Sequence, residues 1–152
     1  KLFQLELPDD IRMLWVILIT TGMRLDEAAL LSRSDIKVEK GIRYFDLTEA
    51  LVKNAGSARK VPIPDVVIEP LDKYVKCRTS LRLFDFPLNA DGKAQNAASK
   101  KSMRFIRKVT LDHALVTHSL RHSFKDMCRD AGVPEDLHDF ITGHSGGDSA
   151  SN

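Results

Sequence analysis

The chain has few cysteines and no long hydrophobic stretch, and each scarcity excludes a class of protein. Cys77 and Cys128 are the only cysteines among 152 residues, and both fall in amphipathic helical patterns. Two reduced thiols in a cytoplasmic protein fit that pattern better than a disulfide or a metal site. The apolar run from Ile11 to Ile19 contains Arg12 and is too short to span a bilayer. No secretory signal pattern precedes that run. We therefore expect a cytoplasmic protein with no membrane partner.

A large excess of charge is also missing from the chain as a whole. The net charge is +2 at pH 7, with 43% hydrophobic and 29% charged residues, a composition typical of one soluble globular domain. The charge is unevenly distributed, however. Residues 93–125 carry eight Lys and Arg against Asp112 alone, whereas residues 126–152 carry one against six acids. One concentrated basic segment predicts a polyanion bound at one face.

Hydrophobic periodicity and turn residues predict a mainly helical domain of the α+β class with a small antiparallel sheet. A helix opening at Pro8 is apolar nearly all round and ends at Gly22. We expect a second helix over residues 25–31, further helices from Pro64, over 96–109, over 118–131 and from Pro134, a loop over 85–95, and strands at Ile36–Leu47, Ala50–Lys53 and Arg59–Ile63.

Three of the predicted helices carry faces that bear on function. On the helix over 96–109, Lys100, Lys101, Arg104, Arg107 and Lys108 share one side, either as a DNA-contacting surface or as solvated charge. The next helix would bury Leu120, Phe124, Met127, Cys128 and Ala131, leaving His118, Arg121, His122 and Lys125 on the opposite side. The last helix would point Leu137, Phe140 and Ile141 inward.

Two motifs far apart in the chain carry groups suited to holding a phosphate. Arg24 directly follows a helix-ending segment, and Glu27 is placed to accept hydrogen bonds from its guanidinium and fix its orientation. His118 and Arg121 lie three residues apart, so both can reach one ligand, and Gly143-His144 follows about two turns after a break. The simpler interpretations are a solvated Arg–Glu pair and a histidine that caps its helix.

Taken together, these motifs resemble the catalytic domain of the tyrosine recombinases, the phage integrase family. The first box runs from Thr21-Gly22-Met23-Arg24 through Glu27 to Asp35-Ile36. The second is His118, Leu120, Arg121 and His122, and the third is Gly143-His144. The resemblance implies a helical catalytic domain with a small three-stranded antiparallel sheet. It also implies site-specific recombination of double-stranded DNA, as in integration or excision of a prophage.

That resemblance assigns roles to individual residues. Arg24 and Arg121 would clamp the phosphate and His144 would donate a further hydrogen bond, with Glu27 and His122 in support. Lys53, in a turn before a strand ending at Pro62, would protonate the leaving oxygen, with Lys60 in reserve. His118 would assist removal of the proton from the attacking tyrosine. The chemistry requires no metal or other cofactor, since fixed cations neutralise the developing charge. Lys100, Lys101, Arg104, Arg107, Lys108 and Lys125 would contact DNA.

The chain departs from the family pattern in one important respect. Tyr44 and Tyr74 are its only tyrosines, and both read as packing residues. In the family the nucleophile follows the Gly-His pair at a distance that falls just beyond Asn152. We therefore expect residues 1–152 to be a catalytic domain cut before its nucleophile, without the N-terminal core-binding domain. Such a fragment would bind DNA without cleaving it in cis. Recombinases of this family assemble as tetramers on DNA, whereas the fragment itself is compatible with a monomer.

Three other interpretations of the same residues stay open. A non-enzymatic helical DNA-binding module would explain the basic segment but not the spacing of His118, Arg121 and His144. A metalloenzyme could use His118, His122 and His144, although no carboxylate stands between the first two and Arg121 would place a cation beside the metal. A type IB topoisomerase shares the phosphotyrosine chemistry, but the integrase-like boxes and the short chain argue against it.

Overall fold

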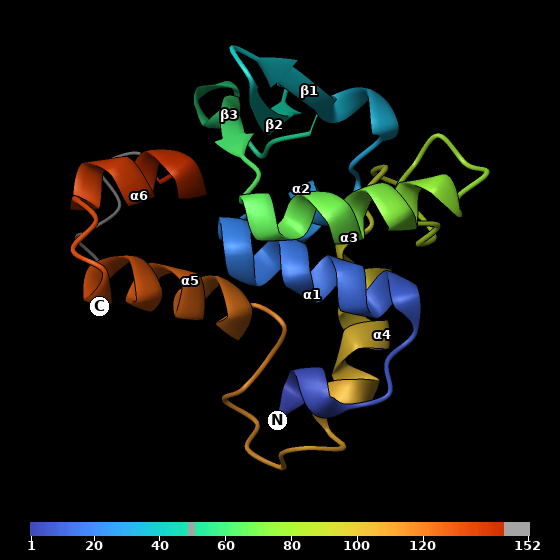
Figure 1. Cartoon of the computed structure of the whole chain (residues 1–152). Helices are drawn as coiled ribbons and strands as arrows, with labels where there is room; N and C mark the ends of the chain where they lie inside the picture. Colours follow the sequence, from blue (N-terminus) through green and yellow to red (C-terminus); the bar gives the residue numbers. More distant parts are fainter. Residues whose placement is uncertain (49–50, 145–152) are drawn as a thin grey trace.

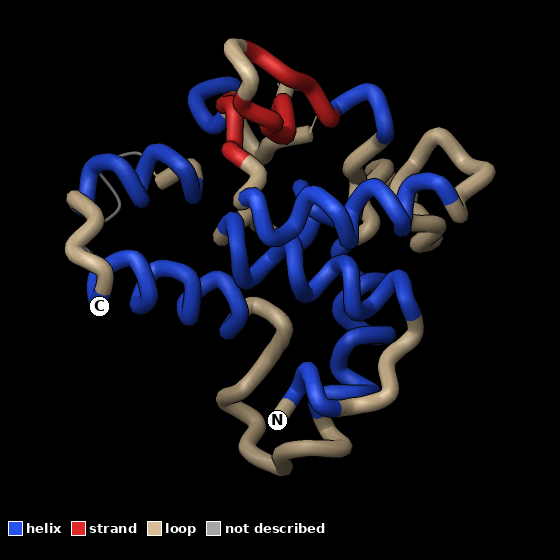
Figure 2. The backbone as a smooth tube through the Cα atoms, in the orientation of Figure 1, coloured by secondary structure: helices blue, strands red, loops and turns tan. Residues whose placement is uncertain are grey.

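The computed structural model describes residues 1–48 and 51–144 of the chain. Within them the elements are α1 (Asp9–Thr21), α2 (Leu25–Ala29), β1 (Ile36–Glu39), β2 (Ile42–Leu47), β3 (Arg59–Pro62), α3 (Asp65–Lys76), α4 (Gln95–Ile106), α5 (Ser119–Asp130) and α6 (Glu135–Thr142). Short 3-10 turns lie at Leu2–Gln4, Arg33–Asp35 and Ala55–Ser57. The predicted class, mainly helical with a three-stranded antiparallel sheet, is confirmed. The strands gather at one end of the molecule, away from α4 (Figures 1 and 2).

Helix α1 forms the centre of the core, as its all-round apolar pattern predicts. Ile11, Leu14, Trp15 and Ile17 on it are fully shielded from solvent. It packs against α2, α3 and α5, which surround it in Figure 1. The indole Nε1 of Trp15 donates to Ser102 Oγ at 3.0 Å, so a buried hydrogen bond joins α1 to α4. The helix ends at Gly22 with a left-handed φ of 64°, a conformation that favours glycine.

The sheet has three strands in the order β1-β2-β3, but their boundaries differ from the prediction. The single strand expected over Ile36–Leu47 is a hairpin, because Lys40 and Gly41 both adopt positive φ, at 50° and 79°, and reverse the chain. The strand expected at Ala50–Lys53 is wrong: Ala50 lies outside the described residues, and 51–53 form turns and bends. A buried Val52 there gave the segment its strand-like alternation.

Helices α5 and α6 depart most from the predicted faces. Met127, Leu137 and Phe140 were expected to be buried but are 47%, 48% and 60% exposed. Ala131 is also exposed, and Phe124, Cys128 and Ile141 are only half-buried. The residues of α6 that are buried are His138 and Thr142. The physical reason is that polar contacts attach α6 to its neighbours, among them Lys125–Asp139 at 2.9 Å and Arg59 Nε to the Ile141 carbonyl at 2.7 Å.

Arg121 is the other residue of α5 whose surroundings differ from the prediction. It was placed on the polar side of the helix, opposite Leu120, yet it is only 3% exposed. The end of α1 and the end of α6 cover it, since its guanidinium reaches both Gly22 and His144.

In the described part of the chain, no helix is both long enough and apolar enough to cross a membrane.

Candidate active site

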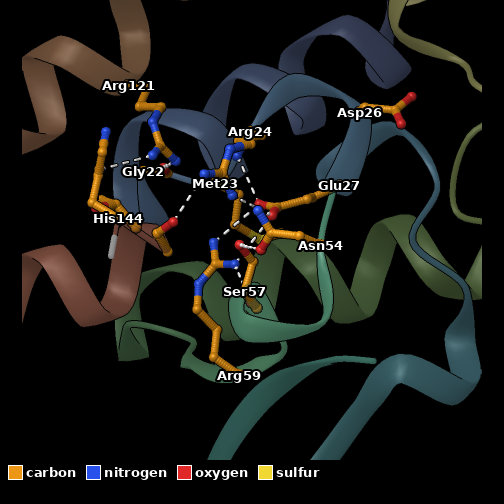
Figure 3. A network of polar contacts seen from close by, with 12 residues as sticks. Gly22, Met23, Arg24, Asp26, Glu27, Asn54, Ser57, Arg59, Arg121 and His144 are labelled. Carbon is orange, nitrogen blue, oxygen red and sulfur yellow. Dashed lines mark hydrogen bonds and ion pairs between the residues drawn. The ribbon is translucent and has the colours of Figure 1, made fainter. Parts of the chain in front are cut away.

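Four of the five residues predicted to be catalytic line one hollow. Arg24, His118, Arg121 and His144 come from three separate parts of the sequence and enclose a space of about 270 Å³, together with Leu25, Gln95, Ser99, Val116 and Thr117. We call this space the arginine–histidine hollow. Figure 3 shows Arg24, Arg121 and His144 approaching one another from α2, α5 and the end of α6. The fold therefore brings together the two predicted phosphate-binding boxes and the Gly-His pair.

Arg24 is held through its backbone and through its guanidinium. It stands at the N-cap of α2, where its backbone N–H donates to Glu27 Oε2 at 2.9 Å. Its Nη1 donates to Glu27 Oε1 at 3.2 Å, and its Nη2 donates to the Gly143 carbonyl at 2.8 Å. The predicted contact between Glu27 and Arg24 is thus present. One face of the guanidinium remains open, since the side chain keeps 28% of its exposure.

Arg121 is more deeply buried than Arg24. Its Nη1 donates to the Gly22 carbonyl at 2.5 Å, and its Nη2 lies 3.1 Å from His144 Nδ1. Gly22 permits this approach, because an added Cβ there would lie 2.3 Å from Phe124 Cδ1. Burial, with repulsion from Arg24 adding to it, lowers the pKa of Arg121 to about 10, so the group stays charged at neutral pH.

The tautomer of His144 follows from its neighbours. An arginine can only donate hydrogen bonds, so His144 Nδ1 must accept from Arg121, and the ring proton is then on Nε2. Thr142 Oγ1 lies 3.0 Å from the same Nδ1. Burial lowers the pKa of His144, and the charges of Arg121 and Lys125 lower it further. The neutral ring therefore has one N–H free to donate, which fits the predicted role.

His118 stands at the N-cap of α5 but makes no capping hydrogen bond through its side chain. The simpler interpretation of a capping histidine is therefore wrong. Its ring packs edge-on against His122, with centroids 4.9 Å apart. Burial lowers the pKa of His118, with further contributions from His122, Arg121 and Arg24. A neutral imidazole can accept a proton, as the predicted role requires.

Lys53 lies beside the hollow rather than in it. It lines a neighbouring space of about 290 Å³ that shares Arg24 and Gln95 with the arginine–histidine hollow. The reserve candidate, Lys60, lies elsewhere: it pairs with Glu39 at 2.6 Å, and its Nζ stands 5.2 Å from the centre of the Tyr44 ring. The geometry therefore favours Lys53 over Lys60 for any role in this site.

The basic residues predicted to contact DNA fall into two groups. Lys100 and Arg104 are exposed on α4, and the exposed Lys108 follows two residues after the helix ends, with its Nζ 4.9 Å from the centre of the Phe105 ring. The other three predicted residues have protein partners: Lys101 pairs with Asp10, Arg107 Nη1 donates to the Asp112 carbonyl at 3.0 Å, and Lys125 pairs with Asp139. The predicted single basic face is thus reduced to three exposed residues, Lys100, Arg104 and Lys108.

Sequence reasoning missed Arg59, which is 7% exposed on β3. Its guanidinium pairs end-on with Glu27, through Nη1 to Oε1 at 3.1 Å and Nη2 to Oε2 at 3.0 Å. The strand period of two was the available signal, because it places Arg59 on the same face as the buried Val61 and opposite the exposed Lys60. We call Arg24, Glu27, Arg59 and Arg121 the polar hub (Figure 3).

The two tyrosines of the chain lie away from the arginine–histidine hollow. Tyr74 is buried on α3, and its hydroxyl donates to the Leu83 carbonyl at 2.7 Å. Burial raises its pKa to about 12, which makes the phenol a poor nucleophile. Tyr44 lies in β2 beneath Lys60. Both therefore behave as the packing residues that the sequence predicts.

The interpretation as a histidine metal site finds no support in the geometry. Over the part of the chain that the structure describes, no group of three or more His, Cys, Asp or Glu side chains is placed to hold a metal ion. His118, His122 and His144 are all among those residues. Furthermore, Arg121 occupies the space that a metal bound to His144 Nδ1 would need.

Comparison with known proteins agrees with this geometry. A sequence profile described as "Phage integrase family" matches residues 6–152. Tyrosine recombinase XerA of Pyrococcus furiosus is 26% identical over 136 residues, which are 88% of this chain and 46% of XerA. Tyrosine recombinase XerC of Pelotomaculum thermopropionicum is 27% identical over 133 residues, 80% of this chain and 42% of XerC. The chain thus spans somewhat less than half the length of these curated relatives.

Solved structures show the same fold. The XerH site-specific recombinase bound to its difH substrate matches with a TM-score of 0.69 and 24% identity, over 95% of this chain and 43% of XerH. The Tn1549 transposon integrase in complex with circular intermediate DNA matches with a TM-score of 0.70 and 21% identity, over 92% of this chain and 53% of the integrase.

Proposed function

Because the chain belongs to the phage integrase family, we propose that it is the catalytic domain of a site-specific recombinase that breaks and rejoins double-stranded DNA. The observation that carries the proposal is the arginine–histidine hollow, where two guanidinium groups and a neutral imidazole converge. Relatives found by sequence are tyrosine recombinases, and XerH is seen bound to its DNA substrate. We extend the setting to a phage or prophage element, as the sequence motifs suggested.

The hollow suits a phosphodiester passing through a transition state with added negative charge. Arg24 and Arg121 would hold the two non-bridging oxygens, while the Nε2–H of His144 would donate to one of them. Donors fixed before the reaction stabilise developing charge without reorganising, and removing one typically costs about 10²–10³ in rate. Glu27 supports this clamp by fixing Arg24. His122 supports the site by packing against His118.

Proton transfer is assigned to the two groups at the edges of the site. Lys53 would protonate the 5′ oxygen as it leaves, and neutral His118 would take the proton from the attacking tyrosine. The attack forms a 3′-phosphotyrosyl bond and breaks the P–O bond to the 5′ oxygen, so the energy of the ester is retained. A second DNA end can therefore reverse the step and be joined without ATP. No metal or other cofactor enters this scheme.

The attacking tyrosine would be supplied from beyond Asn152 in the complete gene product. Tyr44 and Tyr74 are engaged elsewhere in the fold, which supports this placement. Residues 1–152 would then bind DNA and leave it uncut in cis. The complete protein would act as a tetramer on DNA, with an N-terminal core-binding domain that clamps the duplex from the other side.

The exposed basic residues of α4 and of the turn that follows it would contact the DNA backbone next to the hollow. The helix begins at Gln95, and both Gln95 and Ser99 line the arginine–histidine hollow. From there Lys100, Arg104 and Lys108 continue along the exposed side. A duplex whose scissile phosphate sits in the hollow would pass these residues.

A cleavage assay on a denaturing gel tests the proposal. The complete gene product is incubated with a nicked duplex carrying its recombination site, and the covalent protein–DNA complex is measured. We expect the complex with the wild-type protein, no complex with residues 1–152 alone, and a loss of about 10²–10³ in rate with Arg121→Ala. The matched control, Arg43→Ala, lies on the sheet and should cleave normally. DNA binding with no cleavage, and no effect of Arg121→Ala on recombination, would favour a non-enzymatic DNA-binding module instead.

A further inference from the structure

Arg59 joins three segments of the site that are distant in sequence. Its Nη1 and Nη2 bind Glu27 on α2, its Nη1 also donates to the Ser57 carbonyl at 2.8 Å, and its Nε donates to the Ile141 carbonyl on α6 at 2.7 Å. Four of its N–H groups are thus committed, and its side chain is 2% exposed. No part of the guanidinium is left to contact DNA.

Each of those contacts leads to a residue of the proposed chemistry. Through Glu27, Arg59 acts on Arg24. Through Ile141 it fixes the end of α6, two residues before Gly143, whose carbonyl accepts from Arg24. Through Ser57 it holds the turn that follows Lys53, where Ser57 Oγ donates to Asn54 Oδ1 at 2.7 Å. Figure 3 shows the Arg59 guanidinium below Arg24 and between Glu27 and Ser57.

Gly143 shows how closely these groups fit together. A Cβ added at Gly143 would lie 2.6 Å from Arg59 Nη1 and 3.2 Å from Arg24 Nη1. The glycine also has a left-handed φ of 71°. Both arginines therefore lie against the backbone just before His144, and a displacement of Arg59 would be felt on both sides of the hollow.

Arg59 also sets the charge of the clamp. Burial alone would raise the pKa of Glu27, but hydrogen bonds and charge from Arg59, with a smaller contribution from Arg24, lower it. Glu27 is therefore ionised and shared by two arginines. Because Arg59 binds both carboxylate oxygens of Glu27, Arg24 is left only partly neutralised and keeps positive charge for a phosphate.

From these contacts we infer that Arg59 is a positioning residue, which sets the relative placement and charge of Arg24, His144 and the turn after Lys53 without touching DNA. The inference rests on the proposed function for its kinetic consequence, while its structural consequence stands alone. A lysine at this position keeps the charge but has a single nitrogen, so it cannot span Glu27, Ser57 and Ile141 at once.

The test compares Arg59→Lys with Arg43→Lys. Arg43 makes a similar two-nitrogen pair with Asp72, at 2.9 Å and 2.8 Å, on the same sheet but away from the hollow. In residues 1–152, the NMR signals of the His144 and His118 rings should shift in Arg59→Lys and stay in place in Arg43→Lys. In the complete gene product, Arg59→Lys should lower the cleavage rate at saturating DNA by about 100-fold, because small misplacements of reacting groups have effects of that size. The Kd for DNA should change by less than about threefold.

Two results would overturn the inference: unchanged ring signals in a folded Arg59→Lys chain, or a cleavage rate that falls only as far as the folded fraction falls. If the complete wild-type protein does not cleave DNA, the proposed function fails, while the ring signals still decide the role of Arg59. Should Arg59→Lys not fold, the neutral pair Glu27→Gln with Arg59→Gln replaces it, since it removes both charges of the buried Glu27–Arg59 pair together. Wild-type ring signals and a wild-type cleavage rate in that double variant would contradict the inference equally.

Discussion

The apolar core around α1 and the polar hub beneath the hollow are held together by different forces. In the core, Leu14, Trp15 and Ile17 are fully buried and belong to one cluster of buried apolar side chains. In the hub, Arg24 and Arg59 share one carboxylate, Glu27, which is 1% exposed, and Arg121 lies nearby on the Gly22 carbonyl. Apolar burial stabilises the fold, whereas buried ion pairs contribute little net stability because desolvation offsets their attraction. The comparison teaches that stability and activity should respond to different residues.

Substitutions in the two regions should therefore differ in how far they lower the free energy of unfolding, and this is the largest effect that we expect. Trp15→Ala leaves a cavity and removes the bond to Ser102, so it should lower the free energy of unfolding by about 3–5 kcal/mol. Arg121→Met relieves repulsion with Arg24 but leaves the Gly22 carbonyl unpaired, so it should change that energy by no more than about 1 kcal/mol. Urea denaturation of residues 1–152 measures both. A loss in Arg121→Met as large as that in Trp15→Ala would show that the hub is part of the stabilising core.

The next effect concerns which charges of the molecule face DNA. In residues 1–152, replacing Lys100 and Arg104 together by Ala should make the slope of log affinity against log salt less steep by about 1.8, since each phosphate contact contributes about 0.9. Lys101→Ala serves as the control, because Lys101 already pairs with Asp10. Fluorescence anisotropy with a duplex at several salt concentrations gives both slopes. An unchanged slope in the double variant would remove α4 from the interface.

The smallest effect is a dependence of stability on pH that arises in the site and not in the core. The pKa values of His118 and His144 are lowered, chiefly by burial, so the unfolded chain binds more protons than the folded one near and below the ordinary histidine pKa of about 6.5. Stability should therefore fall as pH is lowered from 7 through this region. Thermal unfolding at pH 7 and pH 5.5 should show this fall, and His144→Asn should reduce it. An equal fall in His144→Asn would assign the effect to other groups.

The sequence predicted the elements with strong periodicity and the motifs with specific spacing. Helix α1 followed from its local periodicity, whereas the convergence of Arg24, Arg121 and His144 was expected from the resemblance of their motifs to the phage integrase family. The sheet boundaries did not, since a two-residue turn at Lys40-Gly41 divides what reads as one strand. Hairpin register depends on such turns more than on hydrophobicity.

The faces of α5 and α6 could not be predicted from their apolar periodicity. Phe140 and Met127 are exposed, while His138 and Arg121 are buried. Burial of these polar groups depends on partners far away in sequence, such as Gly22 for Arg121, and no local pattern encodes them. Arg59 was overlooked for a similar reason, because the role of this buried arginine can be assigned only when its acceptors on α2 and α6 are known.

We expect the arginines and histidines of the hollow to form one site for a single phosphate. Titrating inorganic phosphate into residues 1–152 and following the ring signals of His118 and His144 by NMR tests it directly. We predict that both signals shift together with one dissociation constant, that sodium chloride at the same ionic strength does not reproduce the shifts, and that Arg24→Met abolishes them while Lys73→Met does not. Two different dissociation constants, or shifts that survive in Arg24→Met, would contradict the account.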